Sequence, residues 1–547
     1  MIAALVVMAL VAVGLITWRV TAGPRGGSAA RTGTAPSGSA SGSASSPTGA
    51  ASGSGAAGAS GDPRMPASVS TPADPDPDVP RPGATGLGDR LYPALGNGGY
   101  QVDHYDLDLR YPTASATAPL TGTVTATAVA GRALSSFSLD FAGTAVGSVT
   151  VDGAPATFRR DGEELVVTPA QPLTRGARFV VTVRDFASVA PSADPGKFEI
   201  GLLGATDGTV WMGQPANSHQ VFPSNDHPGD KATFSFRIDV PAGITAVANG
   251  EPEGSPTTAK GRTVWRYIQP EPMATELAQV AVGRFTVTRR AASGGLLVRD
   301  VTPTRLTSTL APLLADEVKQ VDWLRAKVGE YPFKAVGSLV ADATFAFGGL
   351  ESQTLILYPL TVINTPSPEL RRQVMVHELA HQWFGDSVSP AGWSDVWLNE
   401  GHATWYEYLW NAEQQAGAPG ASADQLFDLQ LRDAYGRAGE WRQRSGPVAV
   451  PKGAATSTLF APNVYGGGAL VLYALRQTIG TAAFDRLERS WVSTYRGRSA
   501  STQDFVALAA QVSGRDLSGF ARDWLYGTTL PPMPGHPDWA AESSSPS

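Results

Sequence analysis

The chain has 547 residues, of which 42% are hydrophobic, and its 42 basic and 49 acidic residues give a formal net charge of −7. This length predicts two or three domains of roughly 100–200 residues each. Nucleic acid is not expected as a partner, because no basic block stands out in the sequence. The absence of cysteine from the sequence excludes disulfides, thiolate catalysis and a cysteine-ligated metal site.

The first residues form an apolar segment with no charge before Arg19, and Met1 to Trp18 are mostly Ala, Val, Leu and Ile. About 18 such residues is the lower limit for a membrane span and slightly long for the core of a signal peptide. We therefore interpret residues 1–21 as a transmembrane anchor or signal segment. Residues 22–90 are rich in Gly, Ser, Ala, Pro and Thr, so they have almost nothing to bury and are expected to be a disordered linker.

The pattern of apolar residues then changes along the chain. Residues 91–292 contain runs such as 107–111 in which apolar and charged side chains alternate, which predicts an antiparallel β domain. Helical spacing prevails in residues 293–532, for example in one long stretch over 308–328, and predicts a mainly helical domain. Residues 533–547 are expected to be a disordered tail.

One predicted helix carries a histidine pair. Ser367 is a plausible N-cap, Pro368 suits the first helical position and Gly385 suits the end of the helix. His377 and His381 are four residues apart, so their imidazoles lie on one face of the helix and can share a metal ion.

Two glutamates complete a candidate catalytic metal site. Glu378 is adjacent to the first histidine and can act as general base on a water molecule. Glu400 follows His381 after 18 intervening residues, in a second helix expected to begin near Asn399, and supplies a third ligand. Two histidines and a glutamate leave the fourth position of a Zn²⁺ ion open, as in catalytic rather than structural zinc sites.

These residues resemble the zinc signature of the aminopeptidase N family of gluzincin metallopeptidases, in which HExxH is followed by a glutamate after 18 residues. The run "LNEGH" is nearest to the leukotriene hydrolase branch, and its His402 lies roughly 200° around the helix from Glu400, so it should be a packing or supporting residue rather than a ligand. The resemblance covers about Tyr100 to Pro532. Four further stretches match the family in order: Phe222–Phe234, Phe347–Gln353, Val464–Leu475 and Phe520–Gly527.

The resemblance implies an α+β fold, with a saddle-like antiparallel β domain followed by a thermolysin-like, mainly helical catalytic domain. Many members add a large C-terminal helical domain, for which this sequence has no room, so we expect an open cleft. The chain departs from the family's motifs at three positions, where Met, Asn and Lys are replaced by Leu350, Ser352 and Gly467.

The implied activity is that of a zinc-dependent aminopeptidase, which hydrolyses the N-terminal peptide bond of peptides with a free amino end. By resemblance, Glu351 binds the substrate's ammonium group, Gln214 lies near it, and Tyr465 donates a hydrogen bond to the tetrahedral oxyanion. Gly348 and Gly349 have no side chains, so a substrate backbone could approach them.

Other interpretations stay open. A zinc endopeptidase, or a catalytically inactive binding module on a cell surface, could carry the same motif, and Tyr465 alone could be a core residue. An epoxide hydrolase is disfavoured because Val448–Val464 contains no acidic residue. The expected partners are peptides and, through the apolar segment, a membrane; the oligomeric state stays open. The catalytic domain is expected outside the cytoplasm, either anchored to the membrane or secreted.

Overall fold

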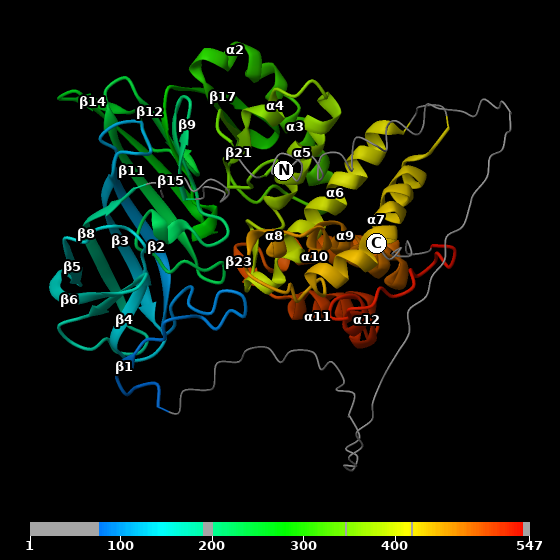
Figure 1. Ribbon diagram of the computed structural model, residues 1–547, viewed down its shortest axis with the longest axis horizontal. Coiled ribbons are helices and arrows are strands. Elements are labelled where there is room, and N and C mark those ends of the chain that lie inside the picture. Colours follow the sequence, from blue (N-terminus) through cyan, green and yellow to red (C-terminus); the bar gives the residue numbers. More distant parts are fainter. Residues whose placement is uncertain (1–75, 190–200, 345–346, 417–419, 540–547) are drawn as a thin grey trace, which may run out of the picture. The chain divides into compact units, whose positions relative to one another are not determined.

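A computed structural model describes residues 76–189, 201–344, 347–416 and 420–539 (Figure 1). The predicted anchor or signal segment, residues 1–21, lies outside the described residues, as does the predicted linker up to residue 75. Within the described part, one stretch, Thr456–Ile479, is long and apolar enough to cross a membrane, but 78% of its apolar 18-residue window is buried inside the protein. This burial is typical of the core helix of a globular domain.

The N-terminal domain is built on a twelve-stranded sheet, drawn in blue to green in Figure 1. Its pairs are antiparallel except for β2 with β11 and β1 with β4. The sheet order is β1-β4-β7-β6-β5-β8-β3-β2-β11-β15-β13, with β14 beside β15. The strands are β1 Arg81–Pro82, β2 Tyr100–Arg110, β3 Leu120–Ala130, β4 Leu134–Asp140, β5 Ser148–Val151, β6 Ala154–Asp161, β7 Glu164–Thr168, β8 Arg178–Ser188, β11 Lys231–Pro241, β13 Glu251–Pro252, β14 Thr257–Ala259 and β15 Arg262–Ala274.

The predicted alternation is confirmed in the long strands. Leu107 and Leu109 of β2 are fully buried, and Phe234 and Phe236 of β11 face the same core. A second, four-stranded sheet extends this domain in the order β12-β16-β10-β9. Its strands are β9 Gly201–Ala205, β10 Gly208–Met212, β12 Thr245–Ala248 and β16 Val280–Gly283.

The catalytic domain combines a five-stranded sheet with helices, of which α6 to α12 are yellow to red in Figure 1. The sheet contains β17 Phe285–Ala291, β18 Leu297–Pro303, β19 Ala335–Val336, β20 Ser338–Ala341 and β21 Ile356–Pro359, and a separate pair is formed by β22 Val388–Pro390 and β23 Arg498–Ala500. The helices are α2 Thr307–Leu310, α3 Glu317–Val328, α4 Leu360–Ile363, α5 Pro368–His381, α6 Trp397–Gln415, α7 Ala423–Ser445, α8 Thr456–Leu459, α9 Pro462–Ile479, α10 Thr481–Thr494, α11 Thr502–Ser513 and α12 Ser518–Trp524.

Four boundaries differ from the sequence-based prediction. The linker does not extend to residue 90, because β1 already pairs with β4 and the buried Asp89 carboxylate accepts hydrogen bonds from the backbone N–H groups of Leu91 and Trp393. The tail does not begin at residue 533, since Trp539 stacks on Tyr473 with ring centroids 5.6 Å apart. The β domain, predicted as 91–292, ends earlier, because β17 pairs with β18 of the catalytic domain.

The fourth difference concerns the long helix predicted over 308–328. It is broken into α2, a 3₁₀ turn at Ala311–Leu314 and α3. Pro312 lies in the turn, and proline offers no N–H group and disrupts a helix interior.

Candidate active site

Helix α5 presents the histidine pair, and its start follows the predicted signals. The Ser367 side chain accepts a hydrogen bond from the backbone N–H of Leu370, and Pro368 occupies the first turn. The helix ends at His381, slightly before Gly385, whose φ of 133° suits glycine in the turn that follows. His377 and His381 are buried on one face, with ring centroids 4.9 Å apart.

The three predicted metal ligands converge on one point. The Nε2 atoms of His377 and His381 each lie 3.4 Å from Glu400 Oε2, which is supplied by the first turn of α6. Zinc–ligand distances of about 2.1 Å imply ligands about 3.4 Å apart in a tetrahedron. Glu400 Oε2 is buried and has no hydrogen-bond donor among the described residues. The donor set therefore fits a zinc ion with an open fourth position.

Hydrogen bonds to the other imidazole nitrogens orient both ligands. His377 Nδ1 lies 2.8 Å from Glu407 Oε2, and His381 Nδ1 lies 3.1 Å from the Phe384 carbonyl oxygen. With each Nδ1–H donating, each Nε2 lone pair points to the metal position. Glu407 was not among the site residues predicted from the sequence. Its signal was the spacing of seven residues from Glu400, which places both carboxylates on one face of a helix.

Glu378 lies beside the metal ligands with its carboxyl group buried. Burial raises the pKa of this carboxyl to about 8; the charges on His377 and His381 oppose the rise, and the charge on Glu351 adds to it. A Cβ on Gly349 would lie 2.6 Å from Glu378 Oε1, so only glycine leaves room for the carboxyl in this position. Gly348 is less constrained, because a Cβ there would be 3.4 Å from Val374.

Glu351 lies close to the metal position and is held by the β domain. Its carboxylate, that of Glu378 and a ring nitrogen of His381 lie within 4.8 Å of one another. Gln214 Nε2 donates a 2.6 Å hydrogen bond to Glu351 Oε1. Gln382, directly after α5, donates to the Glu351 carbonyl oxygen at 3.1 Å. The structure therefore brings together Gln214 and Glu351, which are 137 residues apart in sequence.

Tyr465 stands in the first turn of α9, opposite the histidines. Its ring stacks on His377 with centroids 5.9 Å apart. Helices α6 and α9 pack at a pair of glycines, and a Cβ on Gly401 would lie 2.9 Å from Gly468. Burial, and then the charge on Glu400, raise the pKa of the Tyr465 phenol well above its usual value, so the hydroxyl stays protonated and can donate a hydrogen bond.

His402 is not a metal ligand. Its ring is fully buried, stacks on Phe384 with centroids 4.3 Å apart, and its Nδ1 lies 2.6 Å from the Leu398 carbonyl oxygen. Nε2 lies 3.4 Å from Glu488 Oε1. These contacts confirm the interpretation that His402 is a packing residue.

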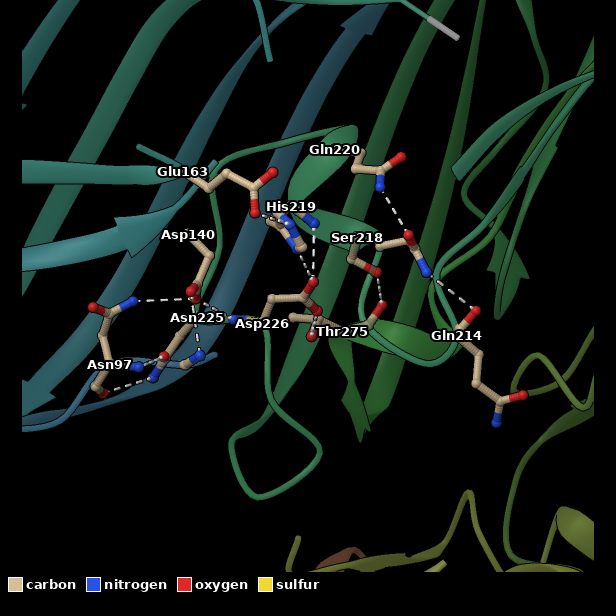
Figure 2. Close-up of polar contacts among 12 residues, drawn as sticks. Asn97, Asp140, Glu163, Gln214, Ser218, His219, Gln220, Asn225, Asp226 and Thr275 are labelled. Carbon is tan, nitrogen blue, oxygen red and sulfur yellow. Dashed lines mark hydrogen bonds and ion pairs between the residues drawn. The ribbon is translucent and has the colours of Figure 1, made fainter. Parts of the chain in front are cut away.

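Figure 2 shows a polar network that includes the segment between β10 and β11, which carries Gln214. Ser218 Oγ donates to the Thr275 carbonyl oxygen at 2.7 Å, and the Thr275 hydroxyl donates to Asp226 at 2.7 Å. His219 Nδ1 lies 2.6 Å from the same Asp226 carboxylate. Burial lowers the pKa of His219, but the hydrogen bonds to Asp226 and Glu163 raise it to about 10. The imidazolium therefore neutralises a buried carboxylate and fixes the loop.

The fold and the donor set together define a two-domain zinc metallopeptidase, with zinc as its cofactor. The chain belongs to peptidase family M1: residues 316–524 match the Peptidase family M1 domain, and residues 205–277 match the Peptidase M1 N-terminal domain. The predicted α+β fold is thus confirmed. The comparisons do not single out the leukotriene hydrolase branch.

Solved structures of similar proteins cover nearly the same chain. An M1 zinc metallopeptidase from Deinococcus radiodurans, bound to a Tyr-Ser-Ala substrate, is 30% identical with a TM-score of 0.70, over 83% of this chain and 100% of that one. A two-domain M1 zinc metallopeptidase bound to L-arginine is 29% identical with a TM-score of 0.69, over 82% of this chain and 99% of that one.

Curated relatives match over a smaller share of their length. Aminopeptidase M1-C of Oryza sativa subsp. japonica is 28% identical over 57% of this chain and 36% of the relative. Leucine aminopeptidase 2 of Aspergillus clavatus is 26% identical over 59% of this chain and 53% of the relative. The aligned part thus spans about a third to a half of these relatives.

Replacing Glu407 by alanine should weaken zinc binding by about 10–100-fold, because His377 loses the acceptor that orients it. The zinc dissociation constant is measured by competition with a chromogenic chelator. Glu413→Ala is the matched control: this glutamate lies on the same helix, but its carboxylate accepts from Trp323 and Lys327 instead. Equal zinc affinities for the two variants would contradict the orienting role of Glu407.

Proposed function

We propose that this protein is a zinc-dependent aminopeptidase that hydrolyses the first peptide bond of peptides with a free amino end. The observation that carries the proposal is the position of Glu351. Its buried carboxylate lies within 4.8 Å of Glu378 and His381, so a group bound to it is about one residue away from the metal position. A carboxylate in this place pairs with an ammonium group, which only the first residue of a peptide carries on its backbone.

The printed names of similar proteins support the same activity. The rice and Aspergillus relatives are called aminopeptidases, and the Deinococcus enzyme was crystallised with a tripeptide described as its substrate.

Bound zinc supplies a Lewis acid for the scissile carbonyl and lowers the pKa of a water molecule. His377, His381 and Glu400 would hold the ion. Glu378 accepts the proton of the attacking water and passes it to the leaving amine. The Tyr465 hydroxyl donates a hydrogen bond to the oxygen on which negative charge develops.

The two rival functions have less support. An inactive binding module would not need the base, yet all three metal ligands and Glu378 are assembled. An endopeptidase needs a cleft that continues past the metal on both sides. Here Glu351 and Gln214 would place a buried negative charge where an internal peptide offers only a neutral backbone.

We further propose that the catalytic domain acts outside the cytoplasm, either tethered or secreted. The apolar run Met1–Trp18 followed by a Gly/Ser/Ala-rich stretch supports this location. Expression of the full chain with a C-terminal tag, followed by protease treatment of intact cells, tests the proposal. The tagged domain should be degraded or found in the medium, and recovery of a protected cytosolic protein with an intact N-terminus would contradict it.

Replacing Tyr465 by phenylalanine should lower kcat by roughly 10²–10³-fold, the scale for loss of one oxyanion donor. KM should change little, because the hydrogen bond forms mainly in the transition state. Steady-state kinetics on an aminoacyl-arylamide measure both constants. Tyr435→Phe removes a buried hydroxyl that donates to the Pro531 carbonyl oxygen, and it serves as the control. An unchanged kcat in Tyr465→Phe would return Tyr465 to a packing role.

The aminopeptidase proposal itself is tested with free and N-acetylated aminoacyl-arylamides. The wild type should prefer the free amine by about 10²–10³-fold, because leaving a buried carboxylate unpaired costs about 3–5 kcal/mol. Glu351→Ala should raise KM and lower kcat/KM for free amines while zinc content stays intact. Equal cleavage of acetylated and free substrates by the wild type would replace the aminopeptidase by the endopeptidase.

A further inference from the structure

The loop that carries Glu351 is closed by backbone hydrogen bonds. Leu350 and Leu357 each donate to the other's carbonyl oxygen, at 2.8 and 2.9 Å. Inside this loop, the Leu355 N–H donates to the Ser352 carbonyl oxygen at 3.0 Å, which makes a β-turn of the four residues that begin at Ser352. Glu351 lies between the closing pair and the turn, so the shape of the turn fixes the place from which its carboxylate extends.

The third residue of the turn, Thr354, has a strained backbone. Its φ is 67°, and the residue is 1% exposed. Positive φ at the third position is typical of a type II turn, where Gly or Asn is favoured. Because threonine is branched at Cβ, it adopts this conformation only at a cost in free energy. Such a conformation persists only where the surrounding structure over-determines it.

Contacts from both domains hold Thr354 in this conformation. Its hydroxyl accepts a 2.7 Å hydrogen bond from the Gly250 N–H and donates to Gln269 Oε1 at 3.3 Å, and both partners belong to the β domain. Its backbone N–H donates at 2.9 Å to Oε1 of Gln382, the residue that directly follows α5.

The fully buried Gln382 amide is used completely in this region. Its Oε1 accepts from the Thr354 N–H and, at 3.0 Å, from the Tyr331 hydroxyl. Its Nε2 donates to the Glu351 carbonyl oxygen at 3.1 Å and to Asp386 Oδ2 at 2.7 Å. An amide side chain offers two acceptor sites and two N–H donors, so all four are engaged.

One side chain therefore binds both ends of the segment from Glu351 to Thr354. Gln382 is also the neighbour of His381 in the chain, so it ties this segment to the helix that carries two of the metal ligands. Gln214 binds the Glu351 carboxylate itself, whereas Gln382 fixes the backbone from which that carboxylate extends.

We propose that Gln382 is a positioning residue, which holds the strained turn at Thr354 and thereby sets the distance between the Glu351 carboxylate and the metal position. This inference rests on the proposed aminopeptidase function and adds to it a residue that acts through Glu351.

Replacing Gln382 by methionine tests this role, because methionine has a similar length and lacks the amide. The preference for free over N-acetylated leucyl-arylamide should fall about tenfold or more, since a binding group misplaced by about 1 Å can cost about 10²-fold. The loss should appear mainly as a higher KM for the free amine, with kcat within about threefold of wild type, because ammonium binding is already made in the ground state. Zinc affinity, measured by chelator competition, should not change.

Gln320→Met is the matched control. This glutamine is also fully buried and also donates to the backbone of α5, at the Arg372 carbonyl oxygen 2.7 Å away, in the first half of the helix. The control should keep the preference for the free amine, even where thermal unfolding shows that it has lost stability.

Two substitutions of Thr354 test the strained turn even if Gln382→Met proves too unstable to purify. Thr354→Gly and Thr354→Val both remove the hydroxyl and its two hydrogen bonds, but only glycine adopts a φ of 67° without strain. Thr354→Gly should therefore keep the preference within about threefold of wild type, and Thr354→Val should lower it about tenfold. Added to Gln382→Met, Thr354→Gly should recover most of the lost preference.

Three outcomes would overturn the proposal: wild-type KM and preference in Gln382→Met, equal preference in Thr354→Gly and Thr354→Val, or a loss in Gln382→Met that follows zinc affinity alone. Equal cleavage of free and acetylated substrates by the wild type would instead refute the aminopeptidase function.

Discussion

Buried carboxyl groups that are hydrogen-bonded to amides, rather than paired with lysine or arginine, are the constraint on which this site depends. Three neutral glutamine side chains, rather than arginines or lysines, donate to three of its carboxylates at 2.5–2.7 Å: Gln214 to Glu351, Gln373 to Glu407 and Gln382 to Asp386. An amide satisfies a carboxylate oxygen but leaves its charge in place. Burying an ionised carboxylate is costly unless a cation pairs with it. These carboxylates therefore attract the metal ion and the substrate's ammonium group.

The same constraint explains why both domains are needed. The β domain supplies Gln214 from one loop, and Lys231 from the start of β11 reaches across to the backbone that follows α5. In the other direction, Asp89 accepts a hydrogen bond from the backbone of Trp393, just before α6. These contacts hold the helices that carry the metal ligands against the β domain, which carries Gln214. A change in either domain would therefore alter the distance between the residues that bind the substrate's amino end and the residues that hold the metal.

The metal site could be predicted from the sequence because its geometry is local. Helical spacing alone places His377 and His381 on one face, and the signals for the start of α5 lie within a few residues. Glu351 and Gln214 could be assigned only through family resemblance, since their contact joins residues 137 positions apart. The predicted linker extended too far because composition does not reveal that Asp89 is buried.

The loop that contains Gly349 and Glu351 sets the distance between the general base and the carboxylate proposed to bind the substrate's ammonium group. We expected Gly349 to give a substrate backbone room to approach, but its missing Cβ first of all leaves room for the Glu378 carboxyl, which a side chain would meet at 2.6 Å. Two residues later, the same loop presents the carboxylate proposed to bind the ammonium group. The spacing between the general base Glu378 and the ammonium acceptor Glu351 is therefore set by the packing of this loop on α5.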